Sequence, residues 1–493
     1  MNKRSILIKK YFEEVSLISS DIESFNNFIE FELQKIVDEN GTILPTIIPH
    51  TIDEFKIKFG KITIGKPELT EADGSKRPIY PLEARLRKIS YAAPLYIEVS
   101  AHVDGIQRES FIAQVGSFPI MLKSKFCHLF ELNEKELIEK GEDPNDPGGY
   151  FVVNGTEKVL INVEDLAPNK MMIEENKTGP SKFTGKLFSE HGAYKIPHTL
   201  EKMKDDIFYL TFTRVKRVPL IAILKALGLV KDEEIMNFID TEFKDEVYIN
   251  LFEFVTIKNE DDALDFIAKK IGITQAKEIR VERMKEILDK YLFPHLGIEP
   301  EDRIFKAYNL CKLAKKFIAV SNGKIGVDDK DHYSNKRLKM SGVLLADLFR
   351  VNLKVLIGDL LYNFQRIVKR GKFPSIKVII RYKLLTQRIY SSMATGNWVG
   401  GRKGIAQRMQ RLNYLETLSH LQRVVSPLSA SQENFEARAL HSTHLGRLCP
   451  IETPEGTNIG LRKNLALLTQ ISQEHNEEEL INLLKSSGVK LSR

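Results

Sequence analysis

The sequence predicts an α+β protein built from several domains. Two hydrophobic periodicities indicate this class, because apolar residues recur at helical spacing in some stretches and at every second position in others. The third observation is length, since 493 residues with a hydrophobic fraction of 42% suffice for about three domains with separate cores. The same size and composition exclude a disordered tail and a small disulfide-dependent scaffold.

The first 160 residues contain both periodicities. A helix is expected to begin near Ser20, because apolar residues follow it at helical spacing. Strands are expected over residues 55–64 and 95–103, where apolar and polar side chains alternate. Asp104-Gly105 and Asn154-Gly155 are typical of the tight turns of β-hairpins.

Charge is distributed unevenly along the chain. Residues 366–425 hold thirteen Lys and Arg and a single acid, Glu416, a net charge of +12 within a chain of +7. Residues 232–266 hold twelve Asp and Glu and two Lys, with enough apolar residues among them to predict a folded segment with a solvated acidic face. Because bound cations release counterions from polyphosphate, we expect nucleic-acid contact in 366–425. The alternative is a solvated helix face whose charge is balanced by acids elsewhere.

The basic segment divides into several expected elements. A long helix is expected over 344–367, a glycine-rich basic loop over 396–404, a helix over 405–424 and a polar loop over 426–437. Residues 449–461 follow, with two prolines, two glycines and two glutamates, and predict a rigid, turn-rich loop. Spacing alone leaves open whether Glu452 and Glu455 orient arginines or touch a ligand.

Other motifs favour structural roles. Residues 60–66 match the first seven positions of a phosphate-binding loop, but Pro67 stands where a hydroxyl would hold Mg²⁺, and the surrounding alternation favours a strand. Residues 328–332 could form a metal cluster, yet Lys330 lies inside them, so local ion pairing in a turn is favoured. For His420 and His444 we expect core or hydrogen-bonding roles.

Cysteine usage and hydropathy bear on location. Cys127, Cys311 and Cys449 are far apart, which favours a reducing compartment and predicts neither a disulfide framework nor a zinc knuckle. No stretch approaches the ~20 apolar residues of a membrane helix, and the N-terminus lacks the apolar run of a signal peptide. We therefore expect a cytoplasmic protein without a membrane partner.

Five blocks of sequence point to a known family. Residues 449–465 resemble the signature of the second-largest (β or B) subunit of multisubunit DNA-directed RNA polymerases. Four more blocks resemble that family in its own order: residues 83–88, 149–159, 331–337 and 394–398. Because the chain ends soon after the signature, it resembles the N-terminal half, B″, of the second-largest subunit as it is split in archaea.

The resemblance implies a domain plan. It assigns residues 1–163 to a protrusion that resumes at 321–397, and residues 164–320 to an inserted lobe. It assigns residues 398–468 to a fork, and 469–493 to the start of an external region. Residues 400–404 and 426–437 would be the two fork loops, at the downstream edge of the DNA bubble.

The resemblance also implies site residues. Four positions match residues that face nascent RNA and the RNA–DNA hybrid: Gln407, Arg423, Glu455 and Asn458. The basic segment adds four cations as candidate nucleic-acid contacts: Arg402, Lys403, Arg408 and Arg411. The sequence departs from the family's pattern at Gln410, usually Asp, at Gln422, usually Arg, and at Arg462, near where Val is common.

By the same resemblance, the chain is a subunit of DNA-directed RNA polymerase, a nucleotidyltransferase used in transcription. It would line the DNA–RNA cleft and help to position template DNA, the hybrid and ribonucleoside triphosphates. RNA synthesis uses two Mg²⁺ ions, and the resemblance places their ligands in partner subunits. We therefore expect no catalytic residue, metal ligand or cofactor in this chain, and no activity of the chain alone.

The expected partners are other polymerase chains and nucleic acid. They are the C-terminal half (B′) of the split second-largest subunit, the two parts of the largest subunit (A′ and A″), the remaining subunits, the DNA template and nascent RNA. Two alternatives stay open. A nucleic-acid-binding protein without enzyme partners would be a stable monomer that binds duplex DNA, and a free-standing nucleotidyltransferase or NTPase would show Mg²⁺-dependent turnover by itself.

Overall fold

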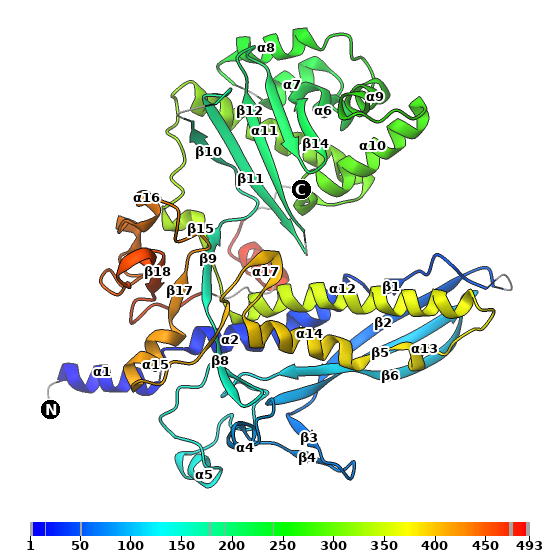
Figure 1. Cartoon of the computed structure of the whole chain (residues 1–493). Coiled ribbons are helices and arrows are strands. Elements are labelled where there is room, and N and C mark those ends of the chain that lie inside the picture. Colours follow the sequence, from blue (N-terminus) through cyan, green and yellow to red (C-terminus); the bar gives the residue numbers. More distant parts are fainter. Residues whose placement is uncertain are drawn as a thin grey trace. The chain divides into compact units, whose positions relative to one another are not determined.

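The computed structural model describes residues 3–14, 16–49, 52–176, 179–192, 194–239, 241–472 and 477–489 (Figure 1). The chain forms two compact units: unit 1 comprises the chain up to Asp165 and from Arg337 onward, and unit 2 comprises Leu166–Lys336. Each unit combines helices with sheets around its own hydrophobic core, so the predicted α+β multidomain class is confirmed. The finer division into protrusion, lobe, fork and external region stays a prediction.

The first helical stretches of unit 1 match their expected positions. α1 spans Lys3–Glu14, and the helix expected near Ser20 runs as α2 (Ser19–Asn27), the π-helical η1 (Phe28–Glu32) and α3 (Leu33–Asp38). Its apolar stripe is buried, including Phe25, Leu33 and Ile36. The long helix expected over 344–367 is α12 (Ser341–Val368), whose first amide donates to the buried Asp21 carboxylate at 3.0 Å.

A four-stranded antiparallel sheet forms the middle of unit 1. Its order is β1 (Thr42–Ile43), β2 (Phe55–Ile64), β5 (Ala92–Val103) and β6 (Ile106–Pro119), and Asp104-Gly105 makes the predicted turn between the last two strands. The pairing of β2 with β5 shifts between Phe59 and Ile62, a β-bulge that explains why the apolar positions change from odd to even numbers. The residues that resemble a phosphate-binding loop begin inside β2, as the alternation predicted.

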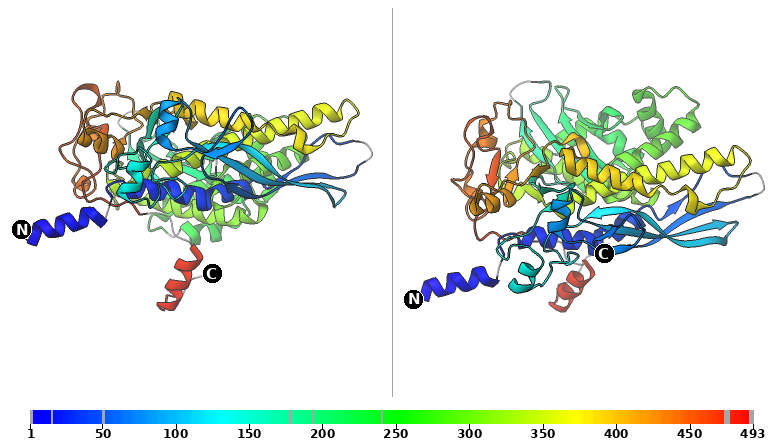
Figure 2. Two further views of the ribbon diagram at one scale, coloured as in Figure 1. Left: turned by 90° about the horizontal axis from the view of Figure 1, so that it is seen from below. Right: turned by 60° about the horizontal axis from the view of Figure 1, so that its bottom comes forward.

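Helices cover this sheet. α13 (Ile376–Ile379) and α14 (Tyr382–Thr395) follow α12, and Thr386 of α14 accepts a hydrogen bond from the Ser117 amide of β6 at 2.8 Å. Figure 2 shows α12 and α14, in yellow, running alongside the strands of the sheet. The remaining short elements of this part are β3 (Glu68–Thr70), β4 (Lys76–Pro78), α4 (Pro81–Leu86) and α5 (Glu134–Glu139).

Two small sheets carry the C-terminal part of unit 1. One has the order β16 (Ala406–Arg408), β8 (Thr156–Leu160) and β7 (Phe151–Val153), with the predicted hairpin turn at Asn154-Gly155. The other has the order β15 (Lys336–Lys339), β9 (Asn162–Leu166), β17 (Arg423–Val425) and β18 (Arg462–Asn464). Short helices lie between and after these strands: η5 (Val399–Gly401), α15 (Tyr414–Leu421), α16 (Phe435–Arg438), η6 (Ser442–His444), η7 (Gly456–Asn458) and α17 (Glu477–Ser486).

The helix predicted over 405–424 is wrong for most of its length. Residues 406–408 pair with β8 instead, and 423–425 form β17. The helix that does form, α15, begins at Tyr414 because the Asn413 side chain accepts a hydrogen bond from the Glu416 amide at 2.8 Å and caps its first turn. Cross-strand pairing and this cap override the helical spacing of the apolar residues.

Unit 2 packs helices against one antiparallel sheet. The sheet runs β10 (Met172–Glu175), β11 (Phe183–His191), β12 (Tyr194–Lys202), β13 (Phe208–Phe212) and β14 (Val215–Pro219). The helices are α6 (Leu220–Ala226), α7 (Asp232–Ile239), α8 (Lys244–Glu253), α9 (Glu260–Ile271), α10 (Lys277–Tyr291), η2 (Pro294–Leu296), η3 (Pro300–Asp302), α11 (Arg303–Ser321) and η4 (Tyr333–Asn335). The acidic segment thus folds as predicted, into α7, α8 and α9, although its Asp240 lies outside the described residues. Among the described helices, none combines the length and apolar character needed to cross a membrane.

Candidate nucleic-acid interface

The glycine-rich basic loop is held at its base and open at its tip. The Trp398 indole donates to the Leu344 carbonyl of α12 at 2.8 Å, and the Trp398 amide donates to the Arg402 carbonyl at 2.8 Å. Gly400, Gly401 and Gly404 all have positive φ, which only glycine adopts readily. Since a side chain at Gly400 or Gly401 would meet no protein atom, the tip leaves space for close approach of another backbone.

The two cations of this loop differ in their partners. Arg402 forms an ion pair with Asp165 at 2.6 Å. Lys403 is exposed and has no ion-pair partner among the described residues. Of the two predicted contacts, Lys403 therefore has the less compensated charge.

A hydrogen-bonded cluster lies behind the loop. His420 is buried, and its Nδ1 accepts a hydrogen bond from the Gln410 amide at 3.2 Å, so its proton lies on Nε2, 3.3 Å from Gln407 Oε1. Burial, with the nearby Arg423 charge, lowers the pKa of His420 to about 4, so the ring is neutral at pH 7. The structure thus brings together Gln407 and Arg423, two of the predicted site residues.

Gln410, one of the departures that the resemblance implies, belongs to this cluster. Its side-chain carbonyl accepts a hydrogen bond from Arg423 at 3.3 Å. An amide orients the guanidinium without neutralising it, and the nearest acid, Glu416, lies 3.7 Å away. Burial and the neighbouring Arg462 lower the pKa of Arg423. Arg423 is therefore a half-buried cation with little internal compensation.

Two cations face each other across the β16–β8 pair. Arg408 is directly opposite Lys158, and Arg408 is exposed, without an ion-pair partner among the described residues. Burial and the Arg408 charge lower the pKa of Lys158, whose ammonium donates to the Ala394 carbonyl at 2.8 Å. Like charges in opposite positions destabilise a strand pair. Sequence reasoning missed Lys158, because only the strand register reveals its neighbour.

Arg411 has a different environment. Its guanidinium pairs with Glu157 at 2.8 Å and Asp146 at 2.9 Å, and lies 5.0 Å from the centre of the Tyr150 ring. Arg85 pairs with the same Glu157 at 2.9 Å. This network joins the sequence blocks 83–88 and 149–159 to the basic segment, which gives Arg411 a structural role. Its expected contact with nucleic acid stays a prediction.

The loop of residues 449–461 is exposed and internally braced. Thr453 Oγ1 donates to the Arg462 carbonyl at 3.0 Å and accepts from the Gly460 amide at 2.9 Å, while Ser419 of α15 donates to Glu452 at 2.6 Å. The predicted turn-rich loop therefore forms, and Glu452 binds a serine of the neighbouring helix, while the predicted rigidity of the loop stays a prediction. Glu455 is exposed, and Asn458 is partly exposed.

Arg438, a residue that sequence reasoning missed, ties the loop 426–437 to the loop 449–461. Its guanidinium donates to Thr457 and Ile459 carbonyls at 2.7 and 3.0 Å, on either side of Asn458. It also donates to Ala430 and Gln432 carbonyls in the loop 426–437, at 2.9 and 3.2 Å. Gly460 packs so closely that a Cβ there would lie 2.1 Å from the Arg438 carbonyl oxygen. No side-chain pattern signals this bracket, because its acceptors are backbone atoms.

The acidic motif at 328–332 forms ion pairs in a turn of unit 2. Asp328 pairs with Lys316 at 2.7 Å, Asp331 pairs with Lys336 at 3.4 Å, and Lys330 pairs with Glu174. The favoured interpretation, ion pairing, is confirmed, but only the pair of Asp331 with Lys336 is local, because Lys316 and Glu174 come from other elements of unit 2. Within the described residues, no group of three or more His, Cys, Asp or Glu is placed to hold a metal ion. That partner subunits supply the Mg²⁺ ligands stays a prediction.

Comparison with known proteins gives a consistent result. Residues 16–387 match the family described as RNA polymerase beta subunit, and residues 407–471 match domain 3 of RNA polymerase Rpb2. The chain is 44% identical to DNA-directed RNA polymerase subunit Rpo2N of Methanocaldococcus jannaschii, with 99% of each chain covered. It is 40% identical to Rpo2N of Halobacterium salinarum, over 98% of this chain and 95% of that protein.

A longer relative is also similar. Subunit Rpo2 of Saccharolobus solfataricus is 44% identical over 99% of this chain, but the chain covers only 43% of that protein. The chain therefore spans less than half the length of Rpo2 and nearly all of Rpo2N. The resemblance predicted from five sequence blocks, to the N-terminal half of the second-largest subunit, is confirmed.

Proposed function

Because this chain belongs to the RNA polymerase β subunit family, we propose that it works as a subunit of a DNA-directed RNA polymerase and contacts DNA and RNA through its fork segment, residues 398–468. The names of its relatives, Rpo2 and Rpo2N, support the assignment to such an enzyme. The nucleotidyltransferase activity then belongs to the assembled complex, and the isolated chain is inactive.

One observation carries the proposed contact surface. The fork segment displays two exposed cations without an ion-pair partner among the described residues, Lys403 at the glycine tip and Arg408 opposite Lys158. It also holds the half-buried Arg423, whose charge Glu416 compensates only in part, at 3.7 Å. Exposed cations without acids attract phosphates, because each contact releases counterions. The backbone phosphates of DNA or RNA satisfy this requirement along a continuous line.

The hydrogen-bonded cluster gives the surface a fixed geometry. Gln407 is tied to the buried His420 and Arg423 to its neighbour Gln410, so their positions are set before nucleic acid binds. Contacts to phosphate and sugar position a duplex without reading its sequence. Such contacts suit an enzyme that must hold every template in register with the incoming ribonucleoside triphosphate.

Catalysis in this proposal is divided between chains. Two Mg²⁺ ions activate the RNA 3′ hydroxyl and hold the triphosphate, and partner subunits supply their ligands. This chain holds the template DNA and the hybrid. The partners are the C-terminal half of the second-largest subunit, the largest-subunit chains and the remaining polymerase subunits, in the cytoplasm. The Rpo2N name of the relatives supports a separate C-terminal partner.

Reconstitution tests the contact surface. Elongation complexes would be assembled from this chain and its partner subunits on an RNA–DNA hybrid, and their dissociation would be followed as KCl rises. The double variant Gln407→Ala, Arg423→Ala is expected to dissociate about tenfold faster at low salt, and the difference from the wild type should narrow as KCl rises, because a positioned cation and its counterion release are lost. Lys61→Ala, which removes an exposed cation from β2, is the matched control and should match the wild type. A double variant that keeps its hybrid as well as the control at every salt concentration would refute the proposal.

A further inference from the structure

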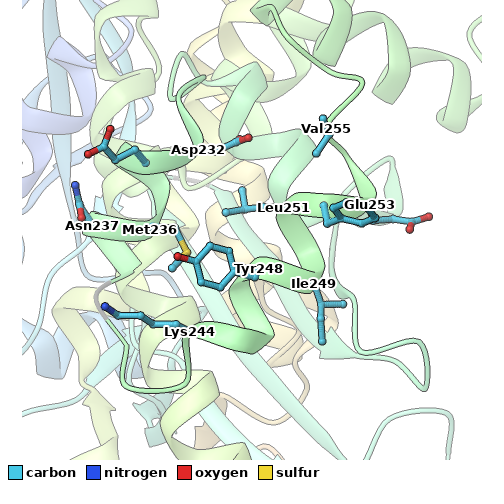
Figure 3. Close-up of a pocket in the computed structure, with 11 residues that line it drawn as sticks. Asp232, Met236, Asn237, Lys244, Tyr248, Ile249, Leu251, Glu253 and Val255 are labelled. Atoms are coloured by element: carbon cyan, nitrogen blue, oxygen red, sulfur yellow. The ribbon is translucent and has the colours of Figure 1, made fainter.

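Unit 2 carries a groove that the proposed function does not use. It lies between α7 and α8 and has a volume of about 890 Å³. Figure 3 shows its lining side chains, which come from these two helices and the residues that follow α8. Its apolar lining residues are Met236, Tyr248, Ile249, Leu251, Phe252 and Val255. Its charged lining residues, called its border below, are Asp232, Glu233, Lys244 and Glu253.

α8 is apolar on two faces. Val247 and Leu251 are buried in the core of unit 2. Tyr248, Ile249 and Phe252 point away from that core and expose 56%, 47% and 81% of their surface. A surface helix normally has one apolar stripe, and a contiguous exposed apolar patch marks an interaction site.

The acids around the groove differ from the other acids of the same segment. Most described acids between residues 232 and 266 form ion pairs, for example Asp232 with Lys225 at 3.0 Å and Asp262 with Lys277 at 2.9 Å. Among the described residues, the exceptions are Glu233, Asp245 and Glu253, and Glu233 and Glu253 both line the groove. Lys244, which has no ion-pair partner in the described part of the chain, also lines it, so the border carries a surplus of negative charge.

We propose that this groove docks an amphipathic, basic helix of a partner protein, with apolar residues at i, i+3 or i+4, and i+7 and with Lys or Arg at its ends. The apolar face would cover Tyr248, Ile249 and Phe252, and the basic ends would meet Glu233 and Glu253. Aromatic anchors in the centre carry affinity, while charges at the rim raise the association rate and select the partner.

Other occupants fit the groove less well. Nucleic acid is repelled by the acidic border. An extended peptide would need an open sheet edge for its backbone hydrogen bonds, whereas both walls of the groove are helices. A second copy of this chain would place the same acids against each other in a symmetric contact. The inference goes beyond the proposed function and does not depend on it.

The test uses a synthetic helical peptide of sixteen residues, with leucines at i, i+3, i+4 and i+7, lysines at both ends and a fluorescent label. Its Kd for the full chain would be measured by fluorescence anisotropy, without nucleic acid. Phe252→Ser should weaken binding at least about tenfold, because it removes the central anchor. The double variant Glu233→Gln, Glu253→Gln should weaken binding roughly threefold at low salt, and the difference should vanish at high salt.

Controls distinguish binding in this groove from nonspecific binding to exposed apolar side chains. Ile279→Ser removes an exposed apolar side chain of α10 outside the groove, 50% exposed, and should leave the Kd unchanged. A peptide with the same composition but scattered leucines, and one with glutamates for lysines, should both bind at least about tenfold more weakly. Equal binding of all three peptides, no binding, or no effect of Phe252→Ser would overturn the proposal. Self-association of the chain that Phe252→Ser abolishes would also overturn it, in favour of a second copy.

Discussion

In the α7–α9 region of unit 2, charged side chains lie on the surface of a large hydrophobic core, whereas in the fork segment of unit 1 they hold the backbone itself. Several acids of α7–α9 pair with exposed lysines, for example Glu234 with Lys231 and Asp262 with Lys277, and the helices are fixed by buried Ile, Leu and Ala. The fork has strands of three residues, and its exposed loops are bound by single polar side chains such as Arg438. Charged residues therefore form surface ion pairs in α7–α9, whereas in the fork segment they fix the conformation of the backbone.

The largest expected difference between the regions concerns Arg438. Arg438→Ala should lower the free energy of opening of the β17–β18 pair by about 2–3 kcal/mol, because four backbone carbonyls lose a charged donor. Lys277→Ala, which removes an exposed ion pair with Asp262 in unit 2, should change local stability by less than about 0.5 kcal/mol. Hydrogen exchange of the β17–β18 amides and of α9–α10 measures both.

Arg438→Lys sharpens this test. An ammonium group lacks the planar fork that reaches carbonyls of both loops, so the lysine variant should recover less than half of the loss. If Arg438→Ala is as mild as Lys277→Ala, the contrast between the two regions is wrong.

A smaller effect is expected within the fork, where Arg411 and Arg408 are three residues apart. Arg411→Ala removes a guanidinium that Glu157 and Asp146 share, and should lower the free energy of unfolding of unit 1 by about 1 kcal/mol, because Arg411 is exposed and Glu157 keeps its ion pair with Arg85. Arg408→Ala removes an exposed cation that faces Lys158, and should leave stability within about 0.5 kcal/mol. Urea unfolding followed by fluorescence of Trp398, the single tryptophan of the chain, gives both values for unit 1. If the two variants lose the same free energy of unfolding, the presence of an acidic partner within the chain does not distinguish a structural arginine from one that binds nucleic acid.

The smallest expected difference appears on mild acidification. Burial lowers the pKa of His198 and of His295 to about 4, and both histidines belong to unit 2. In unit 1, burial lowers the pKa of His420 to about 4 but raises the pKa of Asp21 to about 6. Between pH 6.5 and 4 these histidines are protonated in the unfolded chain but remain neutral in the folded chain. The free energy of unfolding therefore decreases as pH falls through this range. Folded Asp21 takes up its proton earlier than unfolded Asp21, so it adds stability below pH 6.

Unit 2 should therefore lose more stability than unit 1 between pH 6.5 and 5. A fully shifted group contributes at most about 1.4 kcal/mol per pH unit, and the expected excess loss of unit 2 is about 1 kcal/mol. Hydrogen exchange at pH 6.5 and 5, corrected for intrinsic rates, reports each unit separately. Equal losses, or a larger loss in unit 1, would contradict the assignment of these groups.

Local patterns predicted much of the fold, and long-range pairing explains the rest. The hairpins at Asp104 and Asn154 and the helix α12 follow from turn chemistry and spacing. Even the bulge in β2 is visible as a change of parity between Phe59 and Ile62. The helix predicted over 405–424 was wrong because pairing with β8, far away in sequence, decides the conformation of residues 406–408.

In the candidate site, too, some features could be predicted from the sequence and others depend on contacts that only the fold creates. Counting charges located the basic segment, and the family resemblance selected Gln407 and Arg423, which the structure joins through His420 and Gln410. Neither approach distinguished Arg411, which has acidic partners, from Arg408, which has none among the described residues. Arg438 and Lys158 escaped notice because their roles depend on backbone carbonyls and on strand register.

The chain leaves unit 1 through β9 and returns through β15, and these two strands are neighbours in one sheet. In topological terms, unit 2 is therefore a single connection between two adjacent strands of one sheet, whatever the length of that connection. Such a junction tolerates growth, shortening or replacement of the enclosed module, since the register of the host sheet does not change. Lineages could thus have diversified unit 2 without altering the fork, and a short linker in its place is a natural starting point for a minimal version of this protein.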